Sequence, residues 1–189
     1  MKTKQSLVRT LLLIVAIAVS PVVWSQTSFN VAPAADLKIS GTSSLHDWEM
    51  TSKTASGKAV MTAVEQEVTD IKSLTVEMEA ESLKSGKKAM DKNTYKALQT
   101  DVHKKIKFEL NNAAKLANGN WNLTGTFTIA GTTKKVTIPA KIASKGNIHT
   151  VSGSYSFKLT DYSITPPTAL MGTIKTGNDV KISFQIDLK

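Results

Sequence analysis

Apolar and polar side chains alternate along the chain from Trp121 to Ile142, and a glycine turn interrupts the alternation once. One set of alternate positions carries mostly aromatic and aliphatic side chains, while the other carries mostly asparagine, threonine and lysine. Because successive side chains of a β-strand point to opposite faces, this pattern predicts strands with one apolar face and one face in water. The same alternation recurs over most of the chain, for instance from Val180 to Leu188.

The alternating segments together predict an all-β protein with antiparallel strands. Turn residues such as Asn118-Gly119, Gly131 and Gly146 separate several segments, and glycine accepts the positive φ angles that tight hairpins require. The predicted strands span residues 35–43, 57–64, 70–81, 104–110, 120–130, 133–143, 147–159 and 179–188.

Two segments depart from this pattern. Between Gly86 and Thr100 we predict a short helix that Asp91 caps and that covers one end of the strands. Residues 161–178 are expected to form a long connection, because Pro166-Pro167 lacks backbone donors for a sheet. Neither segment indicates a second domain.

Eight antiparallel strands with one apolar face can pack as two sheets or close into a barrel, and alternation alone does not separate these architectures. A closed barrel of about eight strands is either filled with side chains or holds one small ligand. The inward positions mix small residues, such as Gly125, Ala140 and Gly153, with Phe127 and Phe157. The small residues either leave room for a ligand or let large neighbours interdigitate.

The first residues resemble a targeting signal. A basic start with Lys2, Lys4 and Arg9 precedes an apolar run that ends before Pro21. That run is shorter than the roughly 20 residues of a membrane-spanning helix. We therefore predict a cleaved secretory signal peptide, residues 1–25, and a periplasmic or secreted domain of residues 26–189. The chain has no cysteine, which excludes disulfides and lipid anchoring through a thiol.

Lysine and arginine outnumber aspartate and glutamate by 24 to 15. Lysines gather between Lys84 and Lys96 and again between Lys104 and Lys107. They form either a solvated surface or an electropositive rim that meets an anionic headgroup or polyanion. Because aromatic residues do not interleave with them as on a nucleic-acid platform, we predict no nucleic-acid partner.

No catalytic or metal-binding set is evident. The three histidines, His46, His103 and His149, lie more than forty residues apart, whereas a zinc site needs three or four converging ligands. No Gly-x-Ser-x-Gly motif and no phosphate-binding glycine loop occurs. We therefore predict a non-enzymatic protein with no metal and no cofactor. His46-Asp47 is the one place where a histidine adjoins an acid.

Three stretches in order carry a family resemblance: Gly41 to Trp48, with its small residues followed by His-Asp and an aromatic; Leu83 to Phe108; and the hairpin Leu123 to Lys134. Together with residues 151–188 they resemble the YceI family, whose members are secreted, lipocalin-like antiparallel barrels associated with polyisoprenoids or other long-chain lipids. Many relatives carry Arg-x-Asp-Phe-Gly where this chain has Leu159 to Ser163, so a role for that arginine in headgroup recognition does not transfer.

The resemblance implies an eight-stranded antiparallel lipocalin-like barrel with one short helical insertion. It also implies extracytoplasmic binding, sequestration or transport of a long-chain apolar lipid of the isoprenoid, quinone or fatty amide type. His46 with Asp47 then either anchors a polar headgroup or fixes the strand bend, and the aromatic residues line the cavity or form core. The expected ligand-binding residues are Trp121, Phe127, Tyr155, Phe157, Phe184, Phe108, His46 and Trp48.

Three other functions remain open from the sequence. The first is an enzyme that modifies a lipid or small molecule through His46 and Asp47. The second is an envelope protein with a solid core that has a structural or partner-binding role. The third is a polyanion-binding protein that uses the lysines. The carrier hypothesis also includes transient contact with a membrane, and it allows either a monomer or a homodimer.

Overall fold

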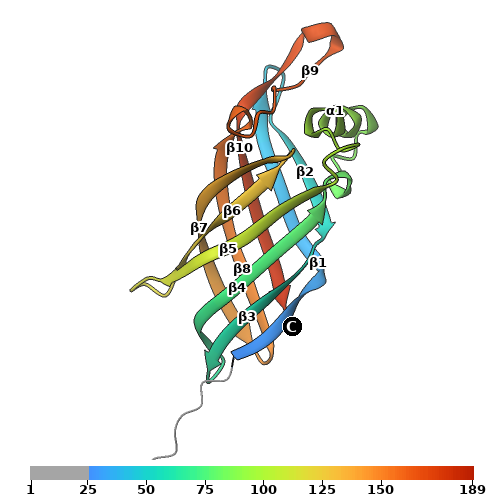
Figure 1. The fold of residues 1–189 in the computed structure, drawn as a ribbon. Helices are drawn as coiled ribbons and strands as arrows, with labels where there is room; N and C mark the ends of the chain where they lie inside the picture. The colour runs from blue at the N-terminus through green and yellow to red at the C-terminus, as the bar shows by residue number, and fades with distance from the viewer. Residues whose placement is uncertain (1–25) are drawn as a thin grey trace, which may run out of the picture.

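The computed structural model describes residues 26–189, and the predicted signal peptide lies outside them. Every second residue of strand β6 (Trp121–Ile129) is buried, as its alternating sequence predicts. The other strands are β1 (Gln26–Ser43), β2 (Trp48–Thr54), β3 (Ser56–Val64), β4 (Glu67–Glu79), β5 (Lys105–Lys115), β7 (Thr132–Lys145), β8 (Ile148–Lys158), β9 (Thr168–Ala169) and β10 (Ile174–Leu188). Helix α1 (Lys88–Leu98) and the short 3-10 turns η1 (Ala80–Ser82), η2 (Leu159–Tyr162) and η3 (Leu170–Gly172) complete the fold (Figure 1).

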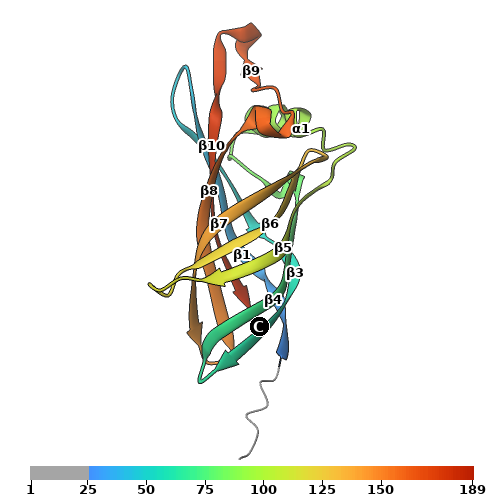
Figure 2. The same ribbon diagram turned by 60° about the vertical axis from the view of Figure 1, so that its left-hand side comes forward.

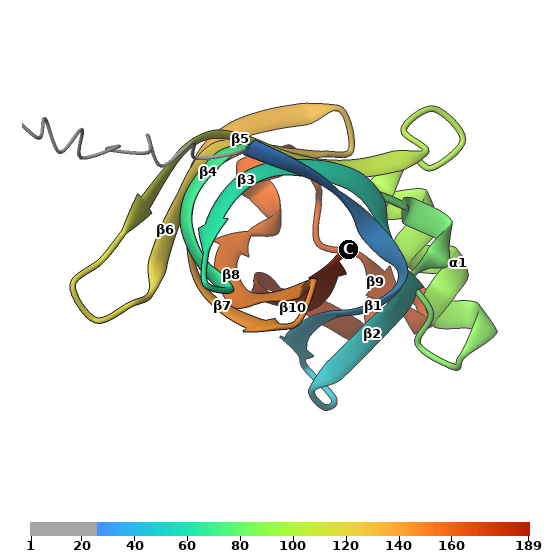
Figure 3. The same cartoon turned by 90° about the horizontal axis from the view of Figure 1, so that it is seen from below.

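The sheet closes on itself through strand β1. One edge of β1 pairs antiparallel with β10, from Val31 opposite Leu188 to Ser43 opposite Thr176. Its other edge pairs first with β3 and then with β2. The eight strands β1, β3, β4, β5, β6, β7, β8 and β10 therefore form a closed antiparallel barrel, which Figure 3 shows along its axis. The expected barrel is confirmed, and the sandwich alternative is wrong.

The predicted strands are all present, but β1, β5 and β10 extend five residues or more beyond their predicted bounds, and β2 was missed. β2 alternates poorly because its inward position Ser52 is polar, although it is buried and hydrogen-bonded to Ser82 through their hydroxyls at 2.7 Å. β1 begins at Gln26 rather than at residue 35. Its first part was not predicted because Pro33 interrupts the alternating pattern. The expected connection over residues 161–178 also holds η2, β9, η3 and the start of β10.

Helix α1 lies where the sequence predicts it, but Asp91 does not cap it. The N-terminal cap is Lys87, and the Asp91 carboxylate in the first turn accepts hydrogen bonds from the backbone N–H and the hydroxyl of Ser85, at 2.8 and 2.6 Å. Asp91 thus orders the loop that leads into the helix. A two-way backbone bridge between Thr51 and Lys84 ties this loop to the free edge of β2.

Helix α1, η2 and the β9 segment all lie at one end of the barrel, as Figure 2 shows. The β3–β4 and β7–β8 turns lie at the other, and the Gly146 N–H donates to the Gln66 side chain across them at 3.1 Å. We call the first the helix end and the second the closed end. No helix among residues 26–189 combines the length and the apolar character needed to cross a bilayer.

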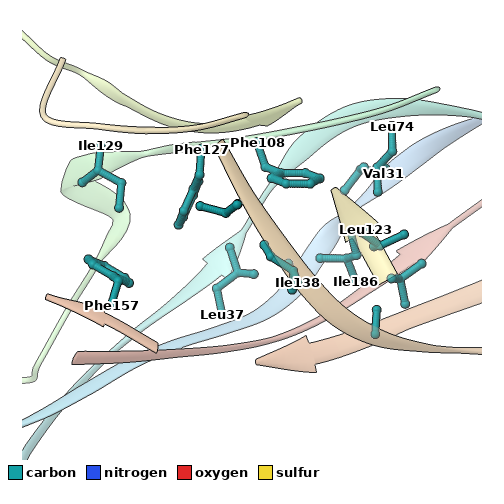
Figure 4. Close-up of a cluster of buried hydrophobic side chains, with 14 of the residues drawn as sticks. Val31, Leu37, Leu74, Phe108, Leu123, Phe127, Ile129, Ile138, Phe157 and Ile186 are labelled. Carbon is teal, nitrogen blue, oxygen red and sulfur yellow. The ribbon is translucent and has the colours of Figure 1, made fainter. Parts of the chain in front are cut away.

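The barrel's interior is packed tightly toward its closed end. Phe29, Met61 and Leu188 are buried there, and the ring of the buried His149 meets the Phe29 ring edge-on at 4.9 Å between centroids. The Nδ1 of His149 lies 2.7 Å from the hydroxyl of Ser144. Figure 4 shows part of the buried apolar cluster of the interior, including Leu37, Phe127 and Ile186.

We expect His149 to make the stability of the fold depend on pH. Burial removes water from the imidazole and lowers the pKa of His149 below its ordinary value of 6.5. The unfolded chain then binds the proton more readily, so the free energy of unfolding falls as the pH drops below about 6.5 and levels off below the folded-state pKa. Urea denaturation between about pH 7 and pH 5, above most carboxyl titrations, measures this slope.

The variant His149→Gln is expected to lose the slope in this pH range. His46→Gln, which changes an exposed histidine, is expected to keep it. An equal slope in the unaltered chain and in His149→Gln would contradict the assignment.

Candidate functional site

Two inward-facing glycines lie against aromatic rings that form the wall of the interior. A Cβ atom on Gly125 would lie 2.7 Å from the Phe108 ring, and a Cβ atom on Gly153 would lie 2.7 Å from the Phe184 ring. Each ring belongs to the neighbouring strand of the barrel. The glycines therefore let large neighbours pack close to the wall, which decides between the alternatives that the sequence left open.

An apolar cavity of about 110 Å³ lies within the barrel, and we call it the inner cavity. Its lining includes Leu37, Leu74, Val76, Met78, Phe108, Leu123, Phe127, Ile138, Val151, Tyr155, Phe184 and Ile186. Lys38 and Glu77 also border it, but their charged groups form ion pairs with Glu49 and Lys105. The space is therefore suited to a hydrocarbon rather than to a polar group.

A larger cavity of about 430 Å³, which we call the outer chamber, lies at the helix end of the barrel. Helix α1, the β1–β2 turn and the segment from Ile164 to Thr176 surround it. Its volume falls within the roughly 300–1,000 Å³ typical of small-molecule sites. Unlike the inner cavity, it is bordered by several polar side chains: Ser43, His46, Lys87, Asn93, Thr94, Thr168 and Thr176.

The two cavities are adjacent and share four aliphatic lining side chains, which we call the collar. These side chains, which line both cavities, are Ile39, Leu83, Ile106 and Ile182. Each is apolar, so a chain passing from the outer chamber to the inner cavity meets no polar group at the junction. The interior of the barrel is thus hollow toward the helix end rather than packed solid along its whole length.

Seven of the eight predicted ligand-binding residues border these cavities. Phe108, Phe127, Tyr155 and Phe184 line the inner cavity. Phe157, His46 and Trp48 line the outer chamber. The structure therefore brings residues from five strands and one turn around two adjacent cavities.

Trp121 is the exception, because it borders neither cavity. It is buried near the closed end, where the ammonium group of Lys115 lies 5.8 Å from the centroid of its ring. Trp121 and Phe127 share one face of β6, but they stand six positions apart along a tilted strand. Trp121 therefore belongs to the packed part of the core and not to the lining of either cavity.

His46 belongs to a tight turn and makes no contact with the carboxylate of Asp47. The Ser43 hydroxyl donates to the His46 carbonyl at 2.7 Å and accepts from the His46 N–H at 3.1 Å. The His46 Nδ1 lies 2.6 Å from the main-chain carbonyl oxygen of Asp47. The pair thus fixes the bend between β1 and β2, and within residues 26–189 no hydrogen bond joins the two side chains as in a catalytic dyad.

Trp48 lines the outer chamber. Its indole N–H donates to the Thr42 carbonyl at 2.9 Å, and a Cβ atom on Gly41 would lie 2.6 Å from its ring. The glycine and the hydrogen bond together hold the indole against β1, so Trp48 offers a fixed aromatic surface to an occupant of the chamber.

An aromatic cluster centred on Phe127 joins the barrel wall to η2. Phe127 lies 6.0 Å from Tyr162 and 6.4 Å from Phe157 between ring centroids, both edge to face, and the Tyr155 and Phe157 rings stack at 5.6 Å. Burial, aided by Tyr155 and Asp161, raises the pKa of the Tyr162 hydroxyl. That hydroxyl is buried and has no hydrogen-bond partner within residues 26–189.

The sequence did not identify the lining residues that lie outside the alternating strands. Examples are Met90 on α1, Ile164 and Leu170, all of which border the outer chamber. Their segments have no period of two, so nothing in the pattern states which way each side chain points. The available signal was weaker: apolar residues within a polar helix and within a connection rich in proline and threonine.

The geometry defines the class of this protein as a closed eight-stranded antiparallel barrel with an apolar cavity beneath a short helix. Residues 24–188 match the YceI-like domain family. The chain therefore belongs to this family, as the sequence motifs implied. No protein among the curated sequences compared with the chain matches it.

Solved structures with the same fold share little sequence with this chain. BcnA from Burkholderia cenocepacia superimposes with a TM-score of 0.68 and 17% identity over 81% of this chain and 95% of its own. A polyisoprenoid binding domain from Saccharophagus degradans gives 0.63 and 12% over 87% and 99%. The YceI protein of Campylobacter jejuni gives 0.57 and 17% over 71% and 80%.

We expect Tyr162→Phe to stabilise the protein. The substitution removes a buried hydroxyl without a partner and keeps the ring contacts, so the free energy of unfolding should rise by roughly 1 kcal/mol. Tyr95→Phe is the matched control, because the Tyr95 hydroxyl shares its one proton between the Glu81 and Leu83 carbonyls and accepts from the Lys84 ammonium group. Denaturant unfolding should show opposite changes, and a destabilised Tyr162→Phe would contradict this account.

Proposed function

We propose that the protein binds one long-chain apolar lipid, of the isoprenoid, quinone or fatty amide type, within the hollow part of the barrel. The observation that carries the proposal is the outer chamber and the adjacent inner cavity, which share the collar. A narrow apolar passage that ends blindly suits an extended hydrocarbon chain. It offers no polar set at its deep end on which a compact polar molecule would be held.

Hydrocarbon transfer alone supplies the affinity for such a ligand. Each methylene removed from water contributes about 0.8 kcal/mol, so ten contribute about 8 kcal/mol before ordering costs. That gross value corresponds to a dissociation constant of about 1 μM. Strong headgroup contacts are therefore unnecessary, in keeping with the replacement of the arginine-containing stretch of many relatives by Leu159 to Ser163.

The polar side chains set the direction in which the ligand lies. They border the outer chamber, where His46, Lys87 and Asn93 face the same space, whereas the inner cavity is lined almost entirely by hydrocarbon. Burying a polar group without a hydrogen-bond partner costs roughly 1–3 kcal/mol in proteins. The apolar tail therefore lies in the inner cavity, and a polar end stays in the outer chamber.

The relatives support the same ligand class. The chain belongs to the YceI-like family, and a solved structure with this fold is described as a polyisoprenoid binding domain. We further propose that the protein sequesters or carries its lipid outside the cytoplasm, since residues 1–25 have the composition of a signal peptide. Cell fractionation and the mass of the purified protein test this proposal, with a chain beginning at Gln26 as the expected result.

Narrowing the collar should separate long ligands from short ones. In Ile182→Phe the larger aromatic side chain narrows the collar. Binding of a long prenyl alcohol such as solanesol should therefore weaken at least about tenfold. Excluding only two methylenes from the inner cavity already costs about 1.6 kcal/mol. Geraniol, which is short enough to stay within the outer chamber, should lose much less affinity. Native mass spectrometry and titration after delipidation measure both.

Ser183→Phe provides the matched control, because it adds the same ring one position away on the outer face of β10. It should bind both alcohols like the unaltered chain. Absence of solanesol uptake by the unaltered chain would refute the proposed function, and equal effects of the two substitutions would refute the route through the collar.

Tryptophan fluorescence should report where the ligand lies. A fatty acid brominated near its carboxyl end should quench Trp48, which lines the outer chamber, and leave Trp121 unaffected. The quenching should therefore persist in Trp121→Phe and largely disappear in Trp48→Phe. Quenching that is lost in Trp121→Phe instead would place the ligand elsewhere.

A further inference from the structure

We propose that the helix end of the barrel docks onto the surface of an anionic lipid bilayer. In this arrangement Leu45, Leu170 and Met171 enter the headgroup region, and lysines of the α1 segment contact lipid phosphates. We call these three apolar residues the rim. The inference rests on the proposed function in one respect: the outer chamber of the docked protein exchanges its lipid with the bilayer.

The first observation is the uneven distribution of exposed apolar side chains. At the helix end Leu45 is 65% exposed, Leu170 is 71% exposed and Met171 is fully exposed. At the closed end the exposed examples are Val64 and Ile148, at 42% and 43%. The two most exposed large apolar side chains among residues 26–189, Met171 and Leu170, thus lie at the helix end, whereas Val102, at 68%, borders neither cavity.

The second observation is the backbone that presents two of the rim residues. Leu170 and Met171 have φ angles of 48° and 55°, which side chains with a Cβ atom rarely adopt, and Gly172 follows with 90°. The Thr173 N–H donates to the Leu170 carbonyl at 3.2 Å and closes this turn. A strained turn that holds apolar side chains in water is typical of a binding surface rather than of a core.

Hydrogen bonds gather the rim residues from two distant parts of the chain. The Ser44 N–H donates to the Lys175 carbonyl at 2.9 Å, and the Lys175 N–H donates to the Ser44 hydroxyl at 3.0 Å. These bonds tie the β1–β2 turn, with Leu45, to the segment that follows Met171. The rim therefore behaves as one surface rather than as two independent loops.

Lysines outnumber acidic residues around this surface, where Asp47 of the β1–β2 turn and Asp91 of α1 are nearby carboxylates. Lys87, Lys88, Lys92 and Lys96 are exposed along the α1 segment, and between Asp161 and Asp179 the only charged residue is Lys175. The ion pairs found among residues 26–189 all lie within or between β-strands, and none of them includes a lysine of the α1 segment or Lys175. Exposed apolar residues beside these lysines match the interface of an anionic bilayer, where both kinds of side chain are accommodated.

Continuity with the cavity favours a bilayer over a protein partner. Leu45 and Leu170 belong to the rim and also line the outer chamber. When the rim lies among the headgroups, a hydrocarbon chain passes from the bilayer into the chamber without entering water. A protein covering the same rim would instead close the chamber.

Site-specific labelling tests which end of the barrel meets the bilayer. Because the chain has no cysteine, Met171→Cys and Ile148→Cys each provide one site for an environment-sensitive fluorophore. With phosphatidylcholine vesicles that contain phosphatidylglycerol, the label at position 171 should shift to the blue and the label at position 148 should not. Equal shifts at both positions, no shift at 171, or a shift at 171 that grows with protein concentration without vesicles would overturn the proposal.

Charge and rim variants complete the test. Lys88→Gln with Lys92→Gln should weaken vesicle binding by about tenfold or more, since a lysine near an anionic surface is worth roughly fivefold in affinity. The control, Lys72→Gln with Lys141→Gln, changes two exposed lysines on the barrel wall and should bind like the unaltered chain. Met171→Ser should also weaken vesicle binding, and equal binding by all variants would overturn the proposal.

Uptake from detergent micelles separates this inference from the proposed function. None of Lys88, Lys92 and Met171 lines a cavity, so their variants should take up solanesol from micelles like the unaltered chain while losing uptake from vesicles. If the unaltered chain takes up solanesol from micelles but does not bind vesicles, docking fails and the proposed function stands. If it takes up none from micelles, the proposed function fails.

Discussion

The hydrogen bonds on both edges of β1 are the constraint on which the rest of the structure depends. β10 occupies one edge along most of its length, while the other edge passes from β3 to β2. The change occurs at Pro33, which lacks a backbone N–H and whose carbonyl accepts from the Ala55 N–H at 3.4 Å. With the ring closed, the wall strands pair with neighbours on both sides, so the interior holds apolar side chains without unpaired backbone groups.

Closure alone does not explain why the barrel is filled at one end and hollow at the other. At the closed end Phe29, Met61 and His149 occupy the interior. Toward the helix end, Gly125 and Gly153 let the Phe108 and Phe184 rings pack close to the wall. Side chains that line a void lose the dispersion contacts of a packed core, and an occupant of the cavity restores them. The same wall is therefore more favourably packed with a ligand present.

The sequence predicted the strands and the face of each residue well, because period two is a property of the strand itself. It did not predict how far along the barrel axis a residue lies. Trp121 and Phe127 follow the same alternation, yet strand tilt and pairing register place one in the packed core and the other at the inner cavity. Register depends on contacts between distant segments, which a local pattern does not contain. β2 was not predicted for the same reason. Ser52 interrupts its alternating pattern, and the hydrogen-bond partner of the buried Ser52, Ser82, lies thirty residues away.

Polarity changes in a consistent order along the barrel axis, and this order bears on how a ligand enters. The inner cavity is lined by hydrocarbon and the ring of Tyr155, and the outer chamber is also lined by the polar side chains of His46 and Lys87. The rim beyond the outer chamber is again apolar. A lipid that entered with its polar end first would leave that group without partners at the deep end, at a cost of roughly 1–3 kcal/mol. One that entered tail first would gain at each methylene and meet polar partners last. The arrangement of side chains therefore favours a single orientation of an elongated, polar-ended molecule, independently of its exact chemical identity.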